Sequence, residues 1–183
     1  MARTFTTASS HSLSVTAVAV SAVPLTMAAW VKTSDITKAT NIIQIRAAFT
    51  DLFRLRLNTS GAPVAQSGQS SVFVTATASA ALSNNTWAHV AAVFASTTSR
   101  TAYLNGGNAG SDANASTPAG VTTTDMATGS DSGATLQIAL PAIWTALSFA
   151  KKSVSLPQLV TTTSSARASD GTLTRATVRR KSR

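Results

Sequence analysis

Residues 53–57 read Phe-Arg-Leu-Arg-Leu, so that three large apolar side chains alternate with two cations. Successive side chains of a β-strand point to opposite faces. The alternation therefore puts the apolar groups on one face and the guanidinium groups of Arg54 and Arg56 on the other. This stretch predicts a strand that buries one face and exposes the other.

The same two-residue period recurs on both sides of this stretch. Residues 87–94 are apolar on both faces apart from His89, which is typical of a central strand that is covered on both sides. A further strand is expected to end at Asn105 and Gly106, because both of these residue types accept the positive φ of a tight hairpin turn. The strand that leads into this turn occupies residues 101–104, and the remaining predicted strands occupy residues 43–47, 72–79, 136–140 and 142–147.

Polar turn clusters separate the predicted strands. They occupy residues 58–61, 67–70, 83–85, 106–108 and 130–133. Many short strands with polar turns, and no convincing amphipathic helix, predict an all-β, antiparallel sandwich or barrel.

The apolar run over residues 13–31 invites interpretation as a signal peptide or a membrane span. Hydroxyl side chains and Pro24 interrupt it, whereas a membrane-spanning helix needs about 20 predominantly apolar residues. Two strands joined through Pro24 explain the same residues, and no membrane partner is predicted.

The strand pattern fails from about residue 148. Residues 151–183 contain eight of the fifteen basic residues but only one of the six acidic ones, so the basic tail carries most of the net charge of +9. Such a segment cannot bury enough apolar area to offset its ordering entropy. We expect a β-sandwich over residues 1–148 and a Ser/Thr/Ala-rich basic tail over residues 149–183 that is disordered, or ordered only on a partner.

Several segments resemble laminin-G-like, concanavalin A-like domains. A Trp-x-His-Val-Ala strand is followed by a Tyr-Leu-Asn-Gly hairpin, and an Ile-Trp pair precedes Ala-Leu-Ser; the matching segments are residues 24–31, 85–94, 102–106 and 138–148. The opening residues 2–5 resemble single-domain versions found in bacteriophage and bacterial proteins. The resemblance implies a jelly-roll sandwich of two curved sheets and a role in binding glycans or proteins. Residues 149–152 are basic where that family runs into a short acidic helix.

Glycoside hydrolases share this architecture, and they need two carboxylates that flank the scissile bond. The relatives with this fold use glutamates on one strand, whereas this chain has no glutamate and no two aspartates within five positions of each other. It also has no cysteine and only two histidines, which leaves few groups for acid–base or nucleophilic catalysis. We predict no catalytic residues and no enzymatic activity.

The candidate ligand-binding residues are Arg46, Arg54 and Arg56. Arg54 and Arg56 project from one sheet face, with Arg46 expected on a neighbouring strand. Such a basic stripe could meet a sulfated glycan, a surface polysaccharide or an acidic protein. The alternative is a solvated outer face.

Some laminin-G-like domains bind calcium, and Asp125 and Asp131 are the plausible ligands for it here. Calcium takes six to eight oxygen ligands, so the alternative is that both are polar loop residues. No other cofactor is predicted. His89 has no nearby acidic or histidine partner in the sequence, which indicates a structural role, packed on Trp87 or paired with the backbone. Trp30, Trp87 and Trp144 lie in apolar stretches and are expected in the core.

Three functions remain open. The first is a non-catalytic, lectin-like adhesion module that binds a glycan or surface polysaccharide from a virion or extracellular surface. The second is a structural virion protein, a capsid decoration or tail component, that binds other virion proteins. The third is a diverged glycanase. We also expect assembly into an oligomer or particle, and contact with nucleic acid only through the basic tail.

Overall fold

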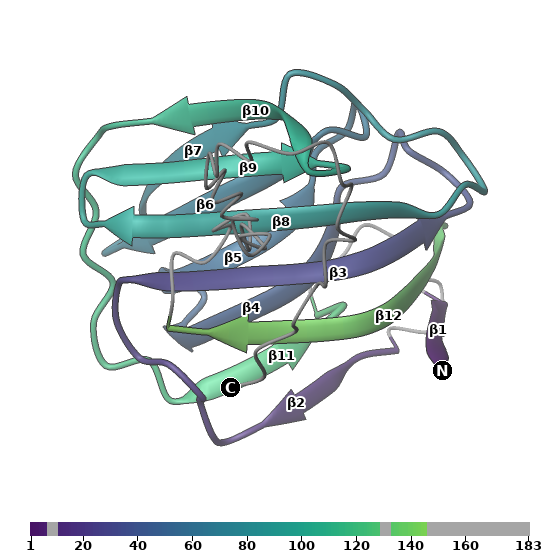
Figure 1. Cartoon of the computed structure of the whole chain (residues 1–183). Helices are drawn as coiled ribbons and strands as arrows, with labels where there is room; N and C mark the ends of the chain where they lie inside the picture. Colours follow the sequence, from purple (N-terminus) through teal and green to yellow (C-terminus); the bar gives the residue numbers. More distant parts are fainter. Residues whose placement is uncertain (7–10, 129–132, 146–183) are drawn as a thin grey trace, which may run out of the picture. The chain divides into compact units, whose positions relative to one another are not determined.

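The computed structural model describes residues 1–6, 11–128 and 133–145 and shows an all-β protein (Figure 1). These ranges contain twelve strands and no helix, and hence no helix that could serve as a membrane span. The chain divides into two units, Met1–Phe149 and Ala150–Arg183, and the second lies entirely outside the described residues. The disorder expected of residues 149–183 therefore stays a prediction.

The first sheet has the strand order β1-β12-β3-β8-β9-β10. Its strands are β1 (Ala2–Thr6), β12 (Thr135–Trp144), β3 (Leu25–Thr33), β8 (Ala88–Ser96), β9 (Ser99–Leu104) and β10 (Gly107–Asp112).

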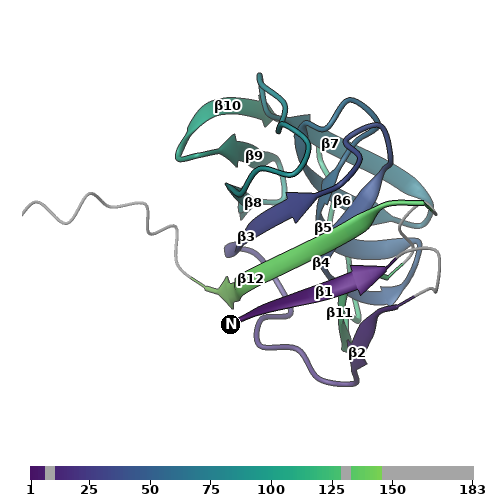
Figure 2. The ribbon, with the colours of Figure 1, turned by 90° about the vertical axis from the view of Figure 1, so that its right-hand side faces the viewer.

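The second sheet has the strand order β2-β11-β4-β5-β6-β7. Its strands are β2 (Leu13–Val15), β11 (Thr123–Met126), β4 (Thr40–Ala48), β5 (Asp51–Leu57), β6 (Pro63–Gln69) and β7 (Val72–Thr77). Every strand pair in both sheets is antiparallel. Figure 2 shows the sheets as two facing layers, so the predicted two-sheet sandwich is confirmed.

The core lies between the layers and is built from the alternate residues of each strand. On β5 the apolar side chains of Phe53, Leu55 and Leu57 are all buried in it, as the alternation predicts. Phe53 meets Phe94 of β8 edge to face, with 5.2 Å between ring centroids, which ties the two sheets together. The outer face of each sheet carries the residues in between.

Most of the predicted strands and turns are confirmed. The apolar run over residues 13–31 holds β2 and most of β3, with Pro24 immediately before β3. Asn105 and Gly106 form the β9–β10 hairpin turn, with φ angles of 52° and 74°. Residues 136–140 and 142–144 belong to one strand, β12, which has an irregularity where Leu140 takes a φ of 48°.

The turn predicted over residues 67–70 is wrong. Strand β6 continues to Gln69, and the chain reverses at Ser70 and Ser71, which both have positive φ. Gly68 misled the sequence interpretation. It is glycine because the ring of Phe73 lies over it: a Cβ on Gly68 would be 2.5 Å from Phe73 Cε1. Strand β11 was not predicted either.

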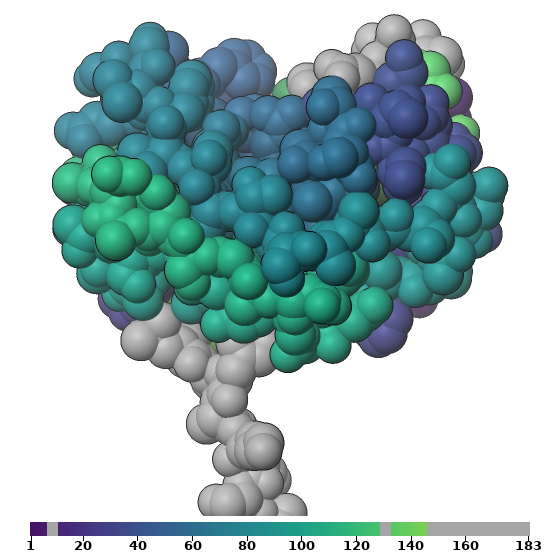
Figure 3. Space-filling view, turned by 90° about the horizontal axis from the view of Figure 1, so that it is seen from above, coloured from purple at the N-terminus to yellow at the C-terminus, as the bar shows by residue number. Residues whose placement is uncertain are grey.

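The two sheets are in close contact along the β7–β10 side. The backbone of Gly110 lies against Thr77, because a Cβ on Gly110 would be 1.6 Å from the Thr77 carbonyl oxygen. The Ser79 N–H donates to the Asn108 carbonyl at 2.9 Å. Figure 3, which looks onto this side, shows the green segment around and after β10 packed against the blue strands of the second sheet. The sandwich is thus closed here by backbone contact.

Candidate functional site

A row of polar side chains crosses the outer face of the second sheet. Each of its six strands contributes one residue, and the strand registers set these residues side by side. This polar row consists, in order, of Ser14, Asp125, Gln44, Arg54, Gln66 and Thr75. Because neighbouring strands place these Cβ atoms about 5 Å apart, each side chain can reach the next.

Arg54 stands in the middle of the polar row and is held by a neutral partner. Its Nε donates to Gln66 Oε1 at 2.9 Å, and its Nη2 donates to the same oxygen. Among the described residues no carboxylate forms an ion pair with Arg54. Burial, together with the like charge of Arg56, lowers the pKa of Arg54 to about 10. The guanidinium is therefore a partly desolvated cation without a counter-ion in the described protein.

A hollow on the same face is lined by Arg56 and by Gln66, the hydrogen-bond partner of Arg54. It has a volume of about 230 Å³, and its lining residues are Arg56, Asn58, Thr59, Val64, Gln66, Thr75 and Thr77. We call it the arginine hollow. Its walls carry one guanidinium, two amides and three hydroxyls, which are groups that recognise hydroxyl and anionic substituents of a ligand. Asn58 is fixed in the β5–β6 turn, where its Oδ1 accepts from the Ser60 and Ala62 N–H groups at 3.0 and 2.9 Å.

Arg46 differs from the other two arginines because it has an acidic partner. Its Nε donates to Asp125 Oδ2 at 2.5 Å, and Gln44 Nε2 donates to the same oxygen at 2.9 Å. The Arg46 guanidinium also stacks over the Phe49 ring, 4.3 Å from its centroid. The structure thus brings Arg54 and Arg56 together on β5, whereas the charge of Arg46 is matched by an acid.

Asp125 lies in strand β11 and not in a loop, and its side chain is fully buried. Burial raises the pKa of Asp125, but hydrogen bonds from Ser14, Arg46 and Gln44 and the charge of Arg46 lower it by more, so that it falls below its usual value. Asp131, the other candidate calcium ligand, lies outside the described residues. Within the described ranges no three acidic or histidine side chains are grouped as a metal would need. The calcium site stays a prediction.

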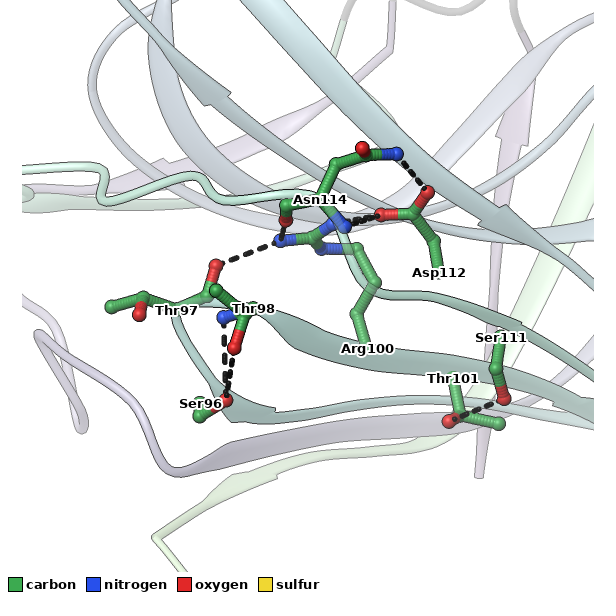
Figure 4. Close-up of polar contacts among 8 residues, drawn as sticks. All are labelled: Ser96, Thr97, Thr98, Arg100, Thr101, Ser111, Asp112 and Asn114. Atoms are coloured by element: carbon green, nitrogen blue, oxygen red, sulfur yellow. Dashed lines mark hydrogen bonds and ion pairs between the residues drawn. The ribbon is translucent and has the colours of Figure 1, made fainter.

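A second arginine cluster has a structural role (Figure 4). Arg100 of β9 is almost fully buried at the end of the sandwich, where it forms an ion pair with Asp112 of β10. Its Nη2 also donates to the carbonyls of Thr97 and Asn114, at 3.1 and 2.8 Å. These bonds tie the β8–β9 turn to the segment after β10. Because the guanidinium of Arg100 is buried and already paired with Asp112 and two carbonyl groups, we do not assign a ligand to this cluster.

The four described aspartates accept hydrogen bonds from neighbours that are not acids. Asp35 accepts from Thr37, Asp51 from Thr50 and Ser70, and Asp112 from Arg100 and Asn114, while Asp125 is bound as above. A glycosidase needs one carboxyl group that donates a proton and a second carboxylate that faces it across the bond. In the described part of the chain we find no arrangement of this kind.

The tryptophans depart from expectation. Trp30 and Trp87 are 43% and 38% exposed and lie outside the core, so their predicted burial is wrong. Trp30 is on the outer face of β3, where the His89 ring meets it edge on at 5.6 Å. His89 therefore packs on Trp30 and not on Trp87, and burial lowers the pKa of His89. Trp144, near the end of the described residues, is half-buried.

Sequence reasoning located the arginines of the site but missed Gln66 and the threonines of β7. Gln66 went unnoticed because residues 67–70 read as a turn, which hid strand β6. The alternation of Thr75 and Thr77 with Val74 and Ala76 was visible. What it did not reveal is that β6 and β7 follow β5 in the sheet and extend the face that carries the arginines.

The sequence profile described as the concanavalin A-like lectin/glucanases superfamily matches residues 6–142. The comparison with curated proteins gives no match. Three similar solved structures are domains LG4-5 of the mouse laminin alpha1 chain (12% identity, TM-score 0.52), a heptameric SAP-like pentraxin from Limulus polyphemus (14%, 0.52) and a botulinum neurotoxin type G receptor binding domain (11%, 0.51).

These three structures match 72%, 68% and 66% of this chain and 39%, 65% and 34% of their own. The chain thus spans between one third and two thirds of the length of these structures. At such low identity the likeness shows the fold, and the function has to be argued from the residues.

Proposed function

Because the chain belongs to the concanavalin A-like lectin/glucanases superfamily, we propose that it is a non-catalytic binding module for an anionic glycan or surface polysaccharide. The ligand lies on the outer face of the second sheet, over Arg54 and the arginine hollow. Its sulfate or carboxylate group pairs with the guanidinium groups, and its hydroxyl groups bond to the threonines and amides of the hollow.

The observation that carries this proposal is the state of Arg54. The protein holds its guanidinium with the neutral oxygen of Gln66 and sets Arg56 on the same face, two residues away. A partly buried cation beside a like charge is costly unless it is paired. An anionic ligand supplies the missing charge, and the planar guanidinium suits the paired oxygens of sulfate or carboxylate.

The absence of glutamate from the whole chain supports binding without hydrolysis. The superfamily includes glucanases as well as lectins, so a diverged glycanase remains the alternative from the same family. Incubation with the bound glycan distinguishes them, because a binding module leaves the length of the polysaccharide unchanged.

The test uses the full chain and sulfated dextran oligosaccharides, with unsulfated dextran of the same length as the control ligand. We expect calorimetry to detect the sulfated form only, with affinity that falls as salt is added. Arg54→Gln should weaken binding about tenfold or more, since a charge-assisted pair is lost. Arg3→Gln removes one charge from β1 of the first sheet and should leave affinity unchanged. Equal binding of both dextrans, or full affinity in Arg54→Gln, would contradict the proposal.

We place the module at a virion or extracellular surface, on the resemblance of residues 2–5 to single-domain phage and bacterial versions. A structural role among virion proteins is the second candidate. It is favoured by apolar side chains on both edge strands of the second sheet, Val15 on β2 and Val72 on β7, which are 56% and 67% exposed. Light scattering tests it: a stable oligomer supports assembly, whereas a monomer argues against it.

A further inference from the structure

We propose that the outer face of the first sheet carries a second carbohydrate site, where a sugar ring bearing a carboxylate stacks on Trp30 and Trp87 and pairs with Lys32. This site lies on the sheet opposite Arg54, so it is independent of the function proposed above. It would make the module bivalent toward acidic polysaccharide.

Two indoles are exposed on the outer face of the first sheet. Ala88 and Val31 point into the core, so their neighbours Trp87, Trp30 and Lys32 point outward. Trp30 pairs with His89, and Val31 with Ala88; the same register continued by one residue sets Lys32 opposite Trp87. The two indoles are thus diagonal neighbours on one face. Exposed indoles that share a sheet face are a feature of binding faces, because their burial by a ligand is favourable.

A neighbouring ring supports the side chain of Trp30. The His89 ring packs against it edge on, with an angle of 64° between the ring planes. His89 itself is held by a hydrogen bond from its backbone N–H to Asn105 Oδ1 at 2.9 Å. A stacking platform benefits from such support, because a side chain that is already ordered loses less entropy when the ligand binds.

A polar hollow lies on the same sheet and includes Lys32 in its lining. It has a volume of about 320 Å³, and its lining residues are Lys32, Ser34, Asn85, Thr135 and Gln137. We call it the lysine hollow. Lys32 and Gln137 are paired across β3 and β12, and Lys32 lies two residues from Trp30 on the same face. The volume is at the lower end of small-ligand sites, about 300 Å³, which suits one sugar unit.

The charge of the lysine hollow indicates the chemistry of its ligand. Lys32 is the one charged residue that lines the lysine hollow, and none of the described lining residues is acidic. An ammonium group pairs with an anion as a point charge. It lacks the planar fork with which arginine donates two parallel hydrogen bonds to one anion. The hydroxyls and amides around it can bond to sugar hydroxyl groups. A sugar ring with a carboxylate therefore combines an apolar face for the indoles with an anion for Lys32.

The experiment uses the full chain carrying Arg54→Gln, so that the site on the second sheet is weakened, and the acidic tetrasaccharide tetragalacturonate, with its methyl ester as the neutral control. We expect the acid to bind, with a change in tryptophan fluorescence, and the ester to bind more weakly. Trp30→Ala and Trp87→Ala should each weaken binding about tenfold. Lys32→Gln should reduce the affinity for the acid to that of the ester.

A control variant and the Arg54→Gln background separate this site from the first. Val72→Ala removes another exposed apolar side chain, on edge strand β7 of the second sheet, and should keep full affinity for tetragalacturonate. Trp87 precedes β8, so Trp87→Ala tests the proposal even if Trp30→Ala does not fold. The proposal is overturned if the acid does not bind, if Lys32→Gln keeps full preference for it, or if Trp87→Ala keeps full affinity.

Discussion

Gln66 accepts two hydrogen bonds from the guanidinium of Arg54 across the β5–β6 pair, from Nε at 2.9 Å and from Nη2. The partner of this partly buried cation is thus an amide and not an acid. An amide orients the guanidinium without cancelling its charge. The neutral partner therefore leaves the charge of Arg54 available to an anionic ligand.

Replacing the amide of Gln66 with an acid should weaken ligand binding and stabilise the folded protein. In Gln66→Glu the new carboxylate pairs with Arg54 and competes with the ligand anion. We expect the affinity for sulfated dextran to fall about tenfold and the free energy of unfolding to rise by about 1 kcal/mol. Calorimetry and urea denaturation measure the two changes. Asn108→Asp adds the same charge to β10 of the other sheet and should leave this affinity unchanged. Unaltered affinity in Gln66→Glu would argue against Arg54 as the anion site.

Binding should depend on pH at the alkaline end. The pKa of Arg54 is lowered to about 10, so the cation is present below that pH and is lost as the pH rises through it. Affinity for sulfated dextran, whose charge does not titrate there, should be constant to about pH 9 and fall above about pH 10. In Arg56→Gln the like charge is gone, and the fall should move to higher pH. Affinity measured between about pH 8 and about pH 11 tests this; a constant affinity would contradict it.

The Arg46–Asp125 pair should stabilise the second sheet and cause part of its acid sensitivity. The pKa of Asp125 is lowered in the folded protein, so its stabilising effect is complete above the unfolded pKa of about 4 and is lost as the pH falls through the folded value. Asp125→Asn should cost about 3 kcal/mol at neutral pH, because it leaves a partly buried arginine unpaired.

Urea denaturation at several pH values measures the effect of Asp125→Asn, which should also flatten the dependence of stability on acid pH. Asp35→Asn alters a carboxylate at the surface of a loop and is the matched control. A loss of stability no greater than that of the control would show that the buried pair contributes little.

Two glycines of β10 should respond in opposite ways to the same substitution. A Cβ on Gly110 would be 1.6 Å from the Thr77 carbonyl, so Gly110→Ala must separate β10 from β7 and should cost at least about 2 kcal/mol. A Cβ on Gly107 meets nothing within 4 Å, so Gly107→Ala should change stability little. Melting temperatures of the two variants measure the difference. Equal melting temperatures would mean that the β7–β10 contact does not constrain the sandwich.

The strands of the sandwich were predictable where their own residues alternate. Residues 53–57 predict β5 because apolar and charged side chains alternate with a period of two. Asn105 and Gly106 predict the β9–β10 turn because few other residue pairs accept positive φ at both positions. Strand β6 was hidden because Gly68 and its small polar neighbours resemble a turn. Gly68 is needed because the ring of Phe73, its partner on the next strand, packs over it. This contact exists only once β6 and β7 are paired, so it is not visible in the residues around Gly68.

The candidate site was predictable only in part. Arg54 and Arg56 share a face by strand periodicity alone, and the sequence shows this directly. The partner of each arginine is a different matter. Asp125 lies 79 positions from Arg46, and only the strand order, which sets β11 beside β4, makes it the counter-ion of Arg46.

By itself the sequence determined the fold class, the inward faces of the main strands and the lack of glutamate for hydrolysis, because each of these depends on composition or on neighbours along the chain. Only the tertiary structure decided which sheet each strand joins. That order makes the row from Ser14 to Thr75, exposes Trp30 and Trp87, and gives Arg54 an amide for a partner. The physical reason is that side-chain direction is a local property of a strand, whereas its neighbours are set by contacts between residues far apart in sequence.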